Sequence, residues 1–254
     1  DTAYPLNPRM ALYAAAYMIN PVQLKGDINM GYDKKDYGAI KKEYGSYYTD
    51  QYIVTDAEGN GLHAYESEEY LKYALRSTFL GASMICLTED TINYANNKQV
   101  IADSWKLYKE QQRPILRGAD VYHILEQPHG ISWDYTDWDG IMYYNEALDK
   151  GSVFLFKENE TGYTSSGQAV DVPDEKVIKL KGLDADATYL VTFEDRTNLN
   201  GAFTGAQLMN DGILVTGMTE KYDSDIMWIE KTGTEEDLES LEIVGDKATI
   251  GKDT

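Results

Sequence analysis

The chain has 254 residues, of which 43% are apolar and 26% are charged, and it carries a net charge of −20 at neutral pH. These proportions are those of an ordinary globular protein with one large domain or two smaller ones. The acidic excess argues against nucleic acid or an anionic membrane surface as a partner, and no run reaches the roughly 20 apolar residues of a membrane span. Cys86 is the single cysteine, which excludes an internal disulfide and a cysteine metal cluster. Because Cys86 lies in an apolar run, we expect a buried, unreactive thiol.

The first part of the chain predicts alternating helices and strands. Apolar residues recur at helical spacing over residues 7–19, and a strand candidate follows at residues 22–28. A second helix begins at residue 67, and residues 82–87 form a continuous apolar strand of the kind that parallel sheets bury on both faces. A third helix is expected over residues 100–116, with Pro114 ending its regular run. This alternation is typical of an α/β layer or barrel.

Residues 30–69 interrupt the alternation with a polar segment rich in glycine and tyrosine, and long excursions of this kind are usually functional or mobile. Within it, Asp56, Glu58 and Asn60 stand at alternate positions before Gly61, as in the first half of a calcium-binding loop. The twelfth position is Ser67, where a bidentate glutamate belongs. A plain Asn-Gly hairpin turn is the alternative.

After Gly118 the pattern changes to short strands separated by Gly, Asp and Asn turns, with no convincing helix between them. An antiparallel β-sandwich is expected from this pattern. The predicted strands cover residues 121–125, 141–144, 153–157, 177–180, 189–194, 213–215 and 226–229.

Aromatic and histidine residues offer weaker signals in the same region. Trp133, Trp138 and Trp228 could form a sugar platform, although tryptophan in a sandwich is more often part of the core. The three histidines lack the spacing of metal ligands. No metal site is therefore predicted apart from the calcium candidate.

Several sequence segments in the first part of the chain resemble family 36 of the glycoside hydrolases, the α-galactosidases. Residues 19–29 (INPVQLKGDIN) resemble barrel strand seven of that family, and residues 73–81 (YALRSTFLG) with 87–90 (LTED) resemble strand eight and its flanks. Residues 105–109 (WKLYK) and 113–122 (RPILRGADVY) are similar to the last barrel helix and the entry to the final domain.

Segments later in the chain also resemble the family, and they occur in the same order as in that family. Residues 181–184 (KGLD), 189–191 (YLV) and 204–212, which begin with TGAQLM, resemble the C-terminal β-sandwich of the family. The resemblance implies an α/β plus all-β chain: the C-terminal portion of a (β/α)₈ barrel over residues 1–117, then an antiparallel β-sandwich over 118–231. Residues 232–254 are expected to be a linker and the start of a further module, and both chain ends to lie within a longer polypeptide.

The resemblance also implies where the chemistry lies. Retaining glycosidases use two carboxyls about 5–5.5 Å apart, a nucleophile and an acid/base. Asp1, followed by Thr2, takes the place of the acid/base after strand six, whereas the nucleophile after strand four is expected upstream of this chain. The alternative for Asp1 is an ordinary N-cap or turn aspartate.

Asp27 and Asn29 should lie at the C-terminal end of strand seven, where barrel enzymes hold active-site groups. Hydrogen bonding to sugar hydroxyls and loop capping are the two interpretations for this pair. Glu89 and Asp90 end strand eight, where we favour helix capping. The tyrosines of residues 30–69 are expected to line the substrate entrance, with at least one of Tyr44, Tyr47, Tyr48 and Tyr52 beside the pocket.

The implied activity is hydrolysis of terminal α-galactosides or α-N-acetylgalactosaminides by double displacement. No cofactor is required for this chemistry, because carboxyls can perform both attack and proton transfer, and calcium remains an option. The expected partners are the carbohydrate substrate and the remainder of the same polypeptide, with no nucleic acid and no membrane span. The rival hypothesis is a non-catalytic carbohydrate-binding protein on the same fold. An extracellular or cell-surface location is expected, with a cytoplasmic one left open.

Overall fold

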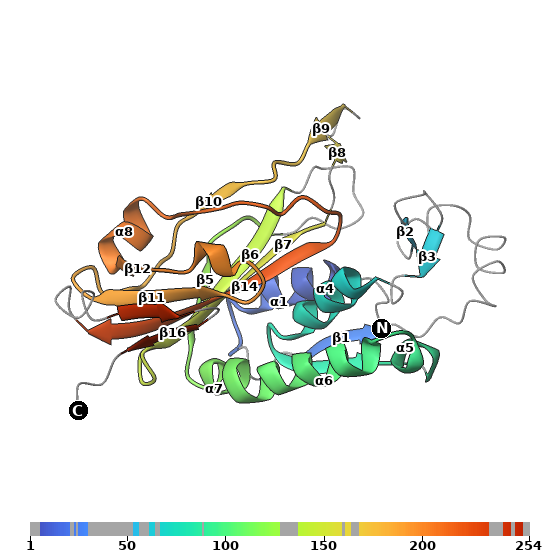
Figure 1. Cartoon of the computed structure of the whole chain (residues 1–254), viewed down its shortest axis with the longest axis horizontal. Coiled ribbons are helices and arrows are strands. Elements are labelled where there is room, and N and C mark those ends of the chain that lie inside the picture. Colours follow the sequence, from blue (N-terminus) through green and yellow to red (C-terminus); the bar gives the residue numbers. More distant parts are fainter. Residues whose placement is uncertain are drawn as a thin grey trace. The chain divides into compact units, whose positions relative to one another are not determined.

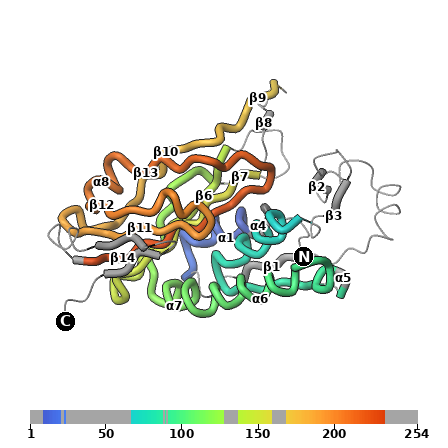
Figure 2. Tube along the Cα trace, viewed as in Figure 1, coloured from blue at the N-terminus to red at the C-terminus, as the bar shows by residue number. Residues whose placement is uncertain are grey.

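A computed structural model of the chain divides into two compact units. Unit 1 comprises Asp1–Arg113, Pro128–Ser132 and Lys221–Ser224, and unit 2 comprises Pro114–Gln127, Trp133–Glu220 and Asp225–Thr254 (Figures 1 and 2). The predicted boundaries at residues 117 and 231 stay predictions. The structure describes residues 6–20, 23, 25–29, 53–55, 61–63, 67–87, 89–127, 137–158, 161–163, 168–233, 241–244 and 247–250.

Helices and strands alternate in unit 1, as the sequence predicts. Strands β1 and β4 pair in parallel, with Lys25 opposite Ala82 and Asn29 opposite Cys86, and β2 and β3 form an antiparallel hairpin. Over the described ranges, no helix combines the length and the apolar character needed to cross a bilayer. The elements are α1 (Leu6–Ala15), β1 (Lys25–Asn29), β2 (Ile53–Thr55), β3 (Gly61–His63), α4 (Glu68–Thr78), β4 (Ala82–Cys86), α5 (Glu89–Asn93), α6 (Asn97–Leu107) and η3 (Tyr108–Gln112).

Helix α4 is the best buried helix of unit 1. Ser67 caps its start by accepting a hydrogen bond from the Tyr70 amide, and two glutamates in the first turn suit the positive end of the helix dipole. Leu71, Ala74 and Leu75 follow at helical spacing and are fully buried. Burial of each leucine contributes roughly 1.5–3 kcal/mol. The helix therefore anchors the core of unit 1.

The third helix reaches Leu116, as predicted, but it contains a π-helical turn that the sequence did not reveal. Helix α6 runs on through the π-helical turn η3 into α7 (Arg113–Leu116), which contains Pro114. A proline clashes with the carbonyl four residues earlier in a regular helix, and the wider turn before it accommodates that clash. The Tyr108 hydroxyl in this turn donates to the Gly81 carbonyl at 2.8 Å and accepts from the Ser83 amide at 3.1 Å. The turn thus fixes the start of β4.

Unit 2 is built on a six-stranded sheet in the order β12-β11-β14-β7-β6-β5 (Figure 1). The pairings β5–β6, β6–β7, β11–β12 and β11–β14 are antiparallel. The strands of this sheet are β5 (Asp120–His123), β6 (Trp138–Asn145), β7 (Lys150–Lys157), β11 (Thr188–Phe193), β12 (Gly201–Thr204) and β14 (Asp223–Gly233).

Smaller elements complete unit 2. They include an antiparallel pair formed by β10 and β13, and two hairpins, β8–β9 and β15–β16. Their bounds are β8 (Thr161–Tyr163), β9 (Ala169–Asp171), β10 (Lys176–Ile178), η4 (Thr197–Leu199), α8 (Gly205–Asn210), β13 (Ile213–Val215), β15 (Leu241–Val244) and β16 (Lys247–Ile250).

The core of unit 2 lies between one face of the large sheet and a layer formed by β10, β13 and α8. Alternate residues of the strands point into it, as period-two patterning requires. The second face of β6 and β7 is buried as well, because every residue of β6 is buried and only Lys150 of β7 is exposed. The core contains Met142, Tyr144, Val153, Leu155, Tyr189, Val191, Met227 and Ile229 from the sheet, and Ile178, Leu208, Ile213 and Val215 from the facing layer.

All seven strands predicted after residue 118 are present, but the expectation of no helix between them is wrong. Helix α8 begins at Thr204, whose hydroxyl accepts from the Gln207 amide at 3.1 Å while the Gln207 side chain accepts from the Thr204 amide at 2.8 Å. This reciprocal pair is a capping box, and the Thr-x-x-Gln spacing was its signal in the sequence. Strands β8, β9 and β12 were also missed.

Candidate active site

The parallel pairing of β1 and β4 brings two strand ends to one edge of unit 1. Asp27 lies opposite Met84 and Asn29 lies opposite Cys86, so both strands finish at the same level. Active sites of α/β architectures form at the carboxyl ends of parallel strands. Asn29 is the last residue of β1 and Asp27 is its middle residue, while both side chains fall outside what the structure describes.

The expectation of a buried Cys86 thiol is wrong. Cys86 is exposed, although the four residues before it in β4 are half-buried. Its exposure follows from its place as the last residue of the strand, which the apolar run alone did not reveal. The same half-exposure overturns the expectation that β4 is buried on both faces.

Other predicted site residues cannot be placed. Asp1, Asp56, Glu58 and Asn60 lie outside the described residues, as do the tyrosines named for the substrate entrance. The flanks of the calcium candidate are described: Thr55 pairs with Gly61 in the β2–β3 hairpin. The connecting residues 56–60 lie outside the described part of the chain, so the calcium loop and the Asn-Gly turn both stay predictions. Over the described residues, no group of three or more His, Cys, Asp or Glu is arranged to hold a metal.

Glu89 and Asp90 open helix α5, since the helix runs from Glu89 to Asn93. Carboxylates are favourable in the first turn of a helix because they face its positive end. The position of both residues at the start of α5 agrees with the helix-capping interpretation.

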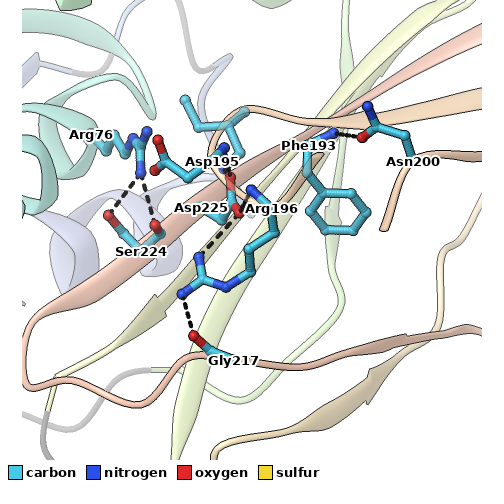
Figure 3. A network of polar contacts seen from close by, with 9 residues as sticks. Arg76, Phe193, Asp195, Arg196, Asn200, Gly217, Ser224 and Asp225 are labelled. Atoms are coloured by element: carbon cyan, nitrogen blue, oxygen red, sulfur yellow. Dashed lines mark hydrogen bonds and ion pairs between the residues drawn. The ribbon is translucent and has the colours of Figure 1, made fainter. Parts of the chain in front are cut away.

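One buried charge of unit 2 is the carboxylate of Asp225, a residue that the sequence analysis did not single out. Its carboxylate is fully buried and accepts hydrogen bonds from the backbone amides of Asp195 and Arg196, each at 3.1 Å (Figure 3). The Arg196 guanidinium also donates to it at 3.1 Å and to the Gly217 carbonyl at 2.9 Å. Such a paired carboxylate holds the loop after β11 in place and is a structural group.

A second buried charge lies at the end of β7. The side chain of Lys157 is fully buried and its ammonium donates to Asp174 at 2.5 Å and to the Met218 carbonyl at 2.7 Å. Nearby, Lys176 pairs with Asp137. These lysines tie the segments on either side of β10 and β13 to the main sheet.

Comparison with known protein families finds a match for most of the large antiparallel sheet. Residues 138–229, which run from the start of β6 into β14, match the sequence model of the glycosyl hydrolase family 36 C-terminal domain. This part of the chain is similar to the C-terminal domain of family 36. The resemblance to the C-terminal part of the family is therefore confirmed.

Solved structures agree with the family 36 assignment at the level of fold. The galactosidase domain of the α-galactosidase-sucrose kinase AgaSK superposes with a TM-score of 0.59 at 15% identity. The α-galactosidase AgaA from Geobacillus stearothermophilus, solved with stachyose, gives 0.58 at 13%, and the α-galactosidase from Lactobacillus brevis gives 0.58 at 10%. Each comparison covers 91% of this chain but 25% of the other, so the chain spans about a quarter of the length of these enzymes. No curated protein sequence matches the chain.

Two tryptophans of the family 36 domain have different environments. Trp138 is 2% exposed and donates its indole N–H to the Pro173 carbonyl at 2.8 Å, which makes it a core residue. Trp228 is half-buried and donates to the exposed Glu194 carboxylate at 3.0 Å. Trp133 lies outside the described residues. The core interpretation is thus right for Trp138.

Burial and hydrogen bonds shift the pKa values of several groups in residues 138–233. Burial raises the pKa of Tyr143, and burial followed by a hydrogen bond with Tyr189 raises the pKa of Tyr144. In both cases burial disfavours the charged phenolate. The pKa of the exposed Asp184 carboxyl is lowered by its hydrogen bond from Lys231.

Proposed function

We propose that the chain is the C-terminal part of a retaining exo-glycosidase that hydrolyses terminal α-galactosides or α-N-acetylgalactosaminides. The observation that carries this proposal is the family 36 C-terminal domain at residues 138–229. Support also comes from the fold shared over most of the chain with three structures described as α-galactosidases or a galactosidase domain. The carbohydrate substrate and the rest of the barrel are the proposed partners.

In this proposal, unit 1 contributes one edge of the substrate pocket. Asp27 in β1 and Asn29 at its end would bind sugar hydroxyls through carboxylate and amide oxygens. Asp1 would protonate the leaving oxygen, and a carboxylate from upstream would attack the anomeric carbon. Carboxyl groups suffice for the proton transfer and for the nucleophilic attack, so this chemistry requires no cofactor.

Turnover tests the proposal directly. A polypeptide that joins this chain to its upstream barrel half should hydrolyse a nitrophenyl α-galactoside or the corresponding N-acetylgalactosaminide, and release the sugar with retained anomeric configuration by NMR. The 254-residue chain alone should be inactive, because in this proposal the nucleophile is supplied by the upstream half of the barrel. Binding of galactose by the longer polypeptide without any turnover would support the carbohydrate-binding rival. Turnover by the short chain alone would contradict the assignment of an upstream nucleophile.

Substitution of Asp27 in β1 tests the proposed substrate contact. Asp27→Ala in the longer polypeptide should lower kcat/KM by about 10- to 100-fold, because a hydrogen bond from a charged group contributes roughly 1.5–3 kcal/mol. Lys25→Ala is the matched control, since Lys25 begins the same strand. Equal losses for both variants would show that Asp27 acts through strand stability alone.

A further inference from the structure

The segment Lys221–Ser224 has an unusual place in the chain. It belongs to unit 1, whereas Glu220 before it and Asp225 after it belong to unit 2. The segment also lies within residues 138–229, the stretch that matches the family 36 C-terminal domain. A part of that sequence is therefore packed among the elements of unit 1.

Tyr222 is the centre of this packing. It is 2% exposed, and its ring meets Tyr70 edge-on with centroids 4.6 Å apart and lies 5.4 Å from the ring of Tyr73. Both partner tyrosines are on helix α4 and are themselves buried. The Lys221 ammonium lies 4.8 Å from the Tyr222 ring centroid. The ring of Tyr222 thus completes an aromatic cluster on α4.

Hydrogen bonds fix both sides of the cluster. The Arg76 guanidinium on α4 donates to the Ser224 carbonyl at 2.7 Å and to the Ser224 hydroxyl at 3.3 Å (Figure 3). On α1, the buried Arg9 donates to the Tyr73 hydroxyl at 2.7 Å and to the Ser77 hydroxyl at 2.9 Å. Helix α4 is therefore held between α1 and the Lys221–Ser224 segment by arginine side chains.

The backbone of Tyr222 shows that docking, not local preference, sets its conformation. Its φ is +61°, in the left-handed region that bulky residues rarely adopt. Such a conformation persists only where the surroundings enforce it. The buried ring contacts and the Arg76 hydrogen bonds supply that enforcement.

We infer that Lys221–Ser224 is an anchor segment that completes the core of unit 1 and holds helix α4, and through it the start of β4. Helix α4 ends at Thr78 and β4 begins at Ala82, so motion of the helix is transmitted to the strand across three residues. This inference rests on packing and does not depend on the proposed hydrolase activity.

Amide hydrogen exchange of the complete 254-residue chain tests the anchor. In Tyr222→Ala the amides of α4 should exchange on the order of 100-fold faster, because loss of a buried aromatic ring is among the largest packing losses. Amides of β6 and β7 should keep their wild-type rates. Tyr222→Phe should restore slow exchange in α4, since the ring contacts remain. Tyr222→Gly should be less severe than Tyr222→Ala, because glycine adopts a positive φ without strain.

Tyr17→Ala is the matched control, since Tyr17 is in unit 1 but 69% exposed. It should leave α4 exchange unchanged. If Tyr222→Ala does not fold, Tyr222→Leu gives the same comparison with a smaller cavity. Wild-type exchange in α4 of either variant, or an equal increase in α4 and in β6–β7, would overturn the anchor.

Discussion

Replacing Asp225 by alanine is expected to lower the free energy of unfolding of the chain by about 3–5 kcal/mol. The carboxylate is fully buried and accepts hydrogen bonds from two backbone amides of the loop after β11 and from the Arg196 guanidinium. Its removal leaves the Arg196 charge, whose side chain is 13% exposed, without this partner. Breaking a buried pair in this way costs more than the pair contributes, because one desolvated charge remains.

Glu230→Ala provides the control for Asp225→Ala. Glu230 lies on the same strand, β14, and pairs with Lys150 at 3.1 Å, the same distance as Asp225 from Arg196. The Glu230–Lys150 pair is about half exposed, so its loss should change stability by about 1 kcal/mol or less. Asp225→Asn, which keeps two acceptor lone pairs but no charge, should fall between them. Urea unfolding followed by circular dichroism measures all three, and equal losses for Asp225→Ala and Glu230→Ala would refute the buried role.

The large elements could be predicted because local pattern and tertiary environment agree. Helix α4 carries its own start signal in Ser67 and its apolar face in Leu71, Ala74 and Leu75. The strands β6, β7, β11 and β14 are rich in β-branched and aromatic residues, which favour a strand over a helix. In these stretches the local sequence alone is enough to predict the secondary structure.

The features that escaped prediction depend on distant partners. The π-helical turn before Pro114 begins at Tyr108, whose hydroxyl bonds Gly81 and Ser83, about 27 residues earlier in the chain. Tyr222 takes a positive φ because it packs on Tyr70. Asp225 finds Arg196 29 residues away, and one sequence contains no signal that links such residues. The candidate site also depends on distant partners. The sequence locates the ends of its strands, but it does not reveal which side chains meet there.

The largest effect on activity is expected from Asp1→Asn in a polypeptide that includes the upstream barrel half. If Asp1 is the acid/base, hydrolysis of an alkyl α-galactoside should slow by roughly 10²–10⁴-fold, because an alkoxide leaves only when it receives a proton. A dinitrophenyl α-galactoside should lose far less in its first step, since its phenolate leaves without a proton. The ratio of the two losses therefore reports proton donation and is insensitive to a general loss of folded enzyme.

Asp27→Ala supplies the comparison that separates the roles of the two aspartates. A residue that binds sugar hydroxyls touches the same glycone in both substrates, so its loss should lower kcat/KM of the alkyl and aryl galactosides by similar factors. A selective loss on the alkyl substrate for Asp1→Asn, beside a uniform loss for Asp27→Ala, would support both assignments. Uniform losses for Asp1→Asn, with a lowered melting temperature, would instead support the N-cap alternative, because a cap contributes to stability and not to proton transfer.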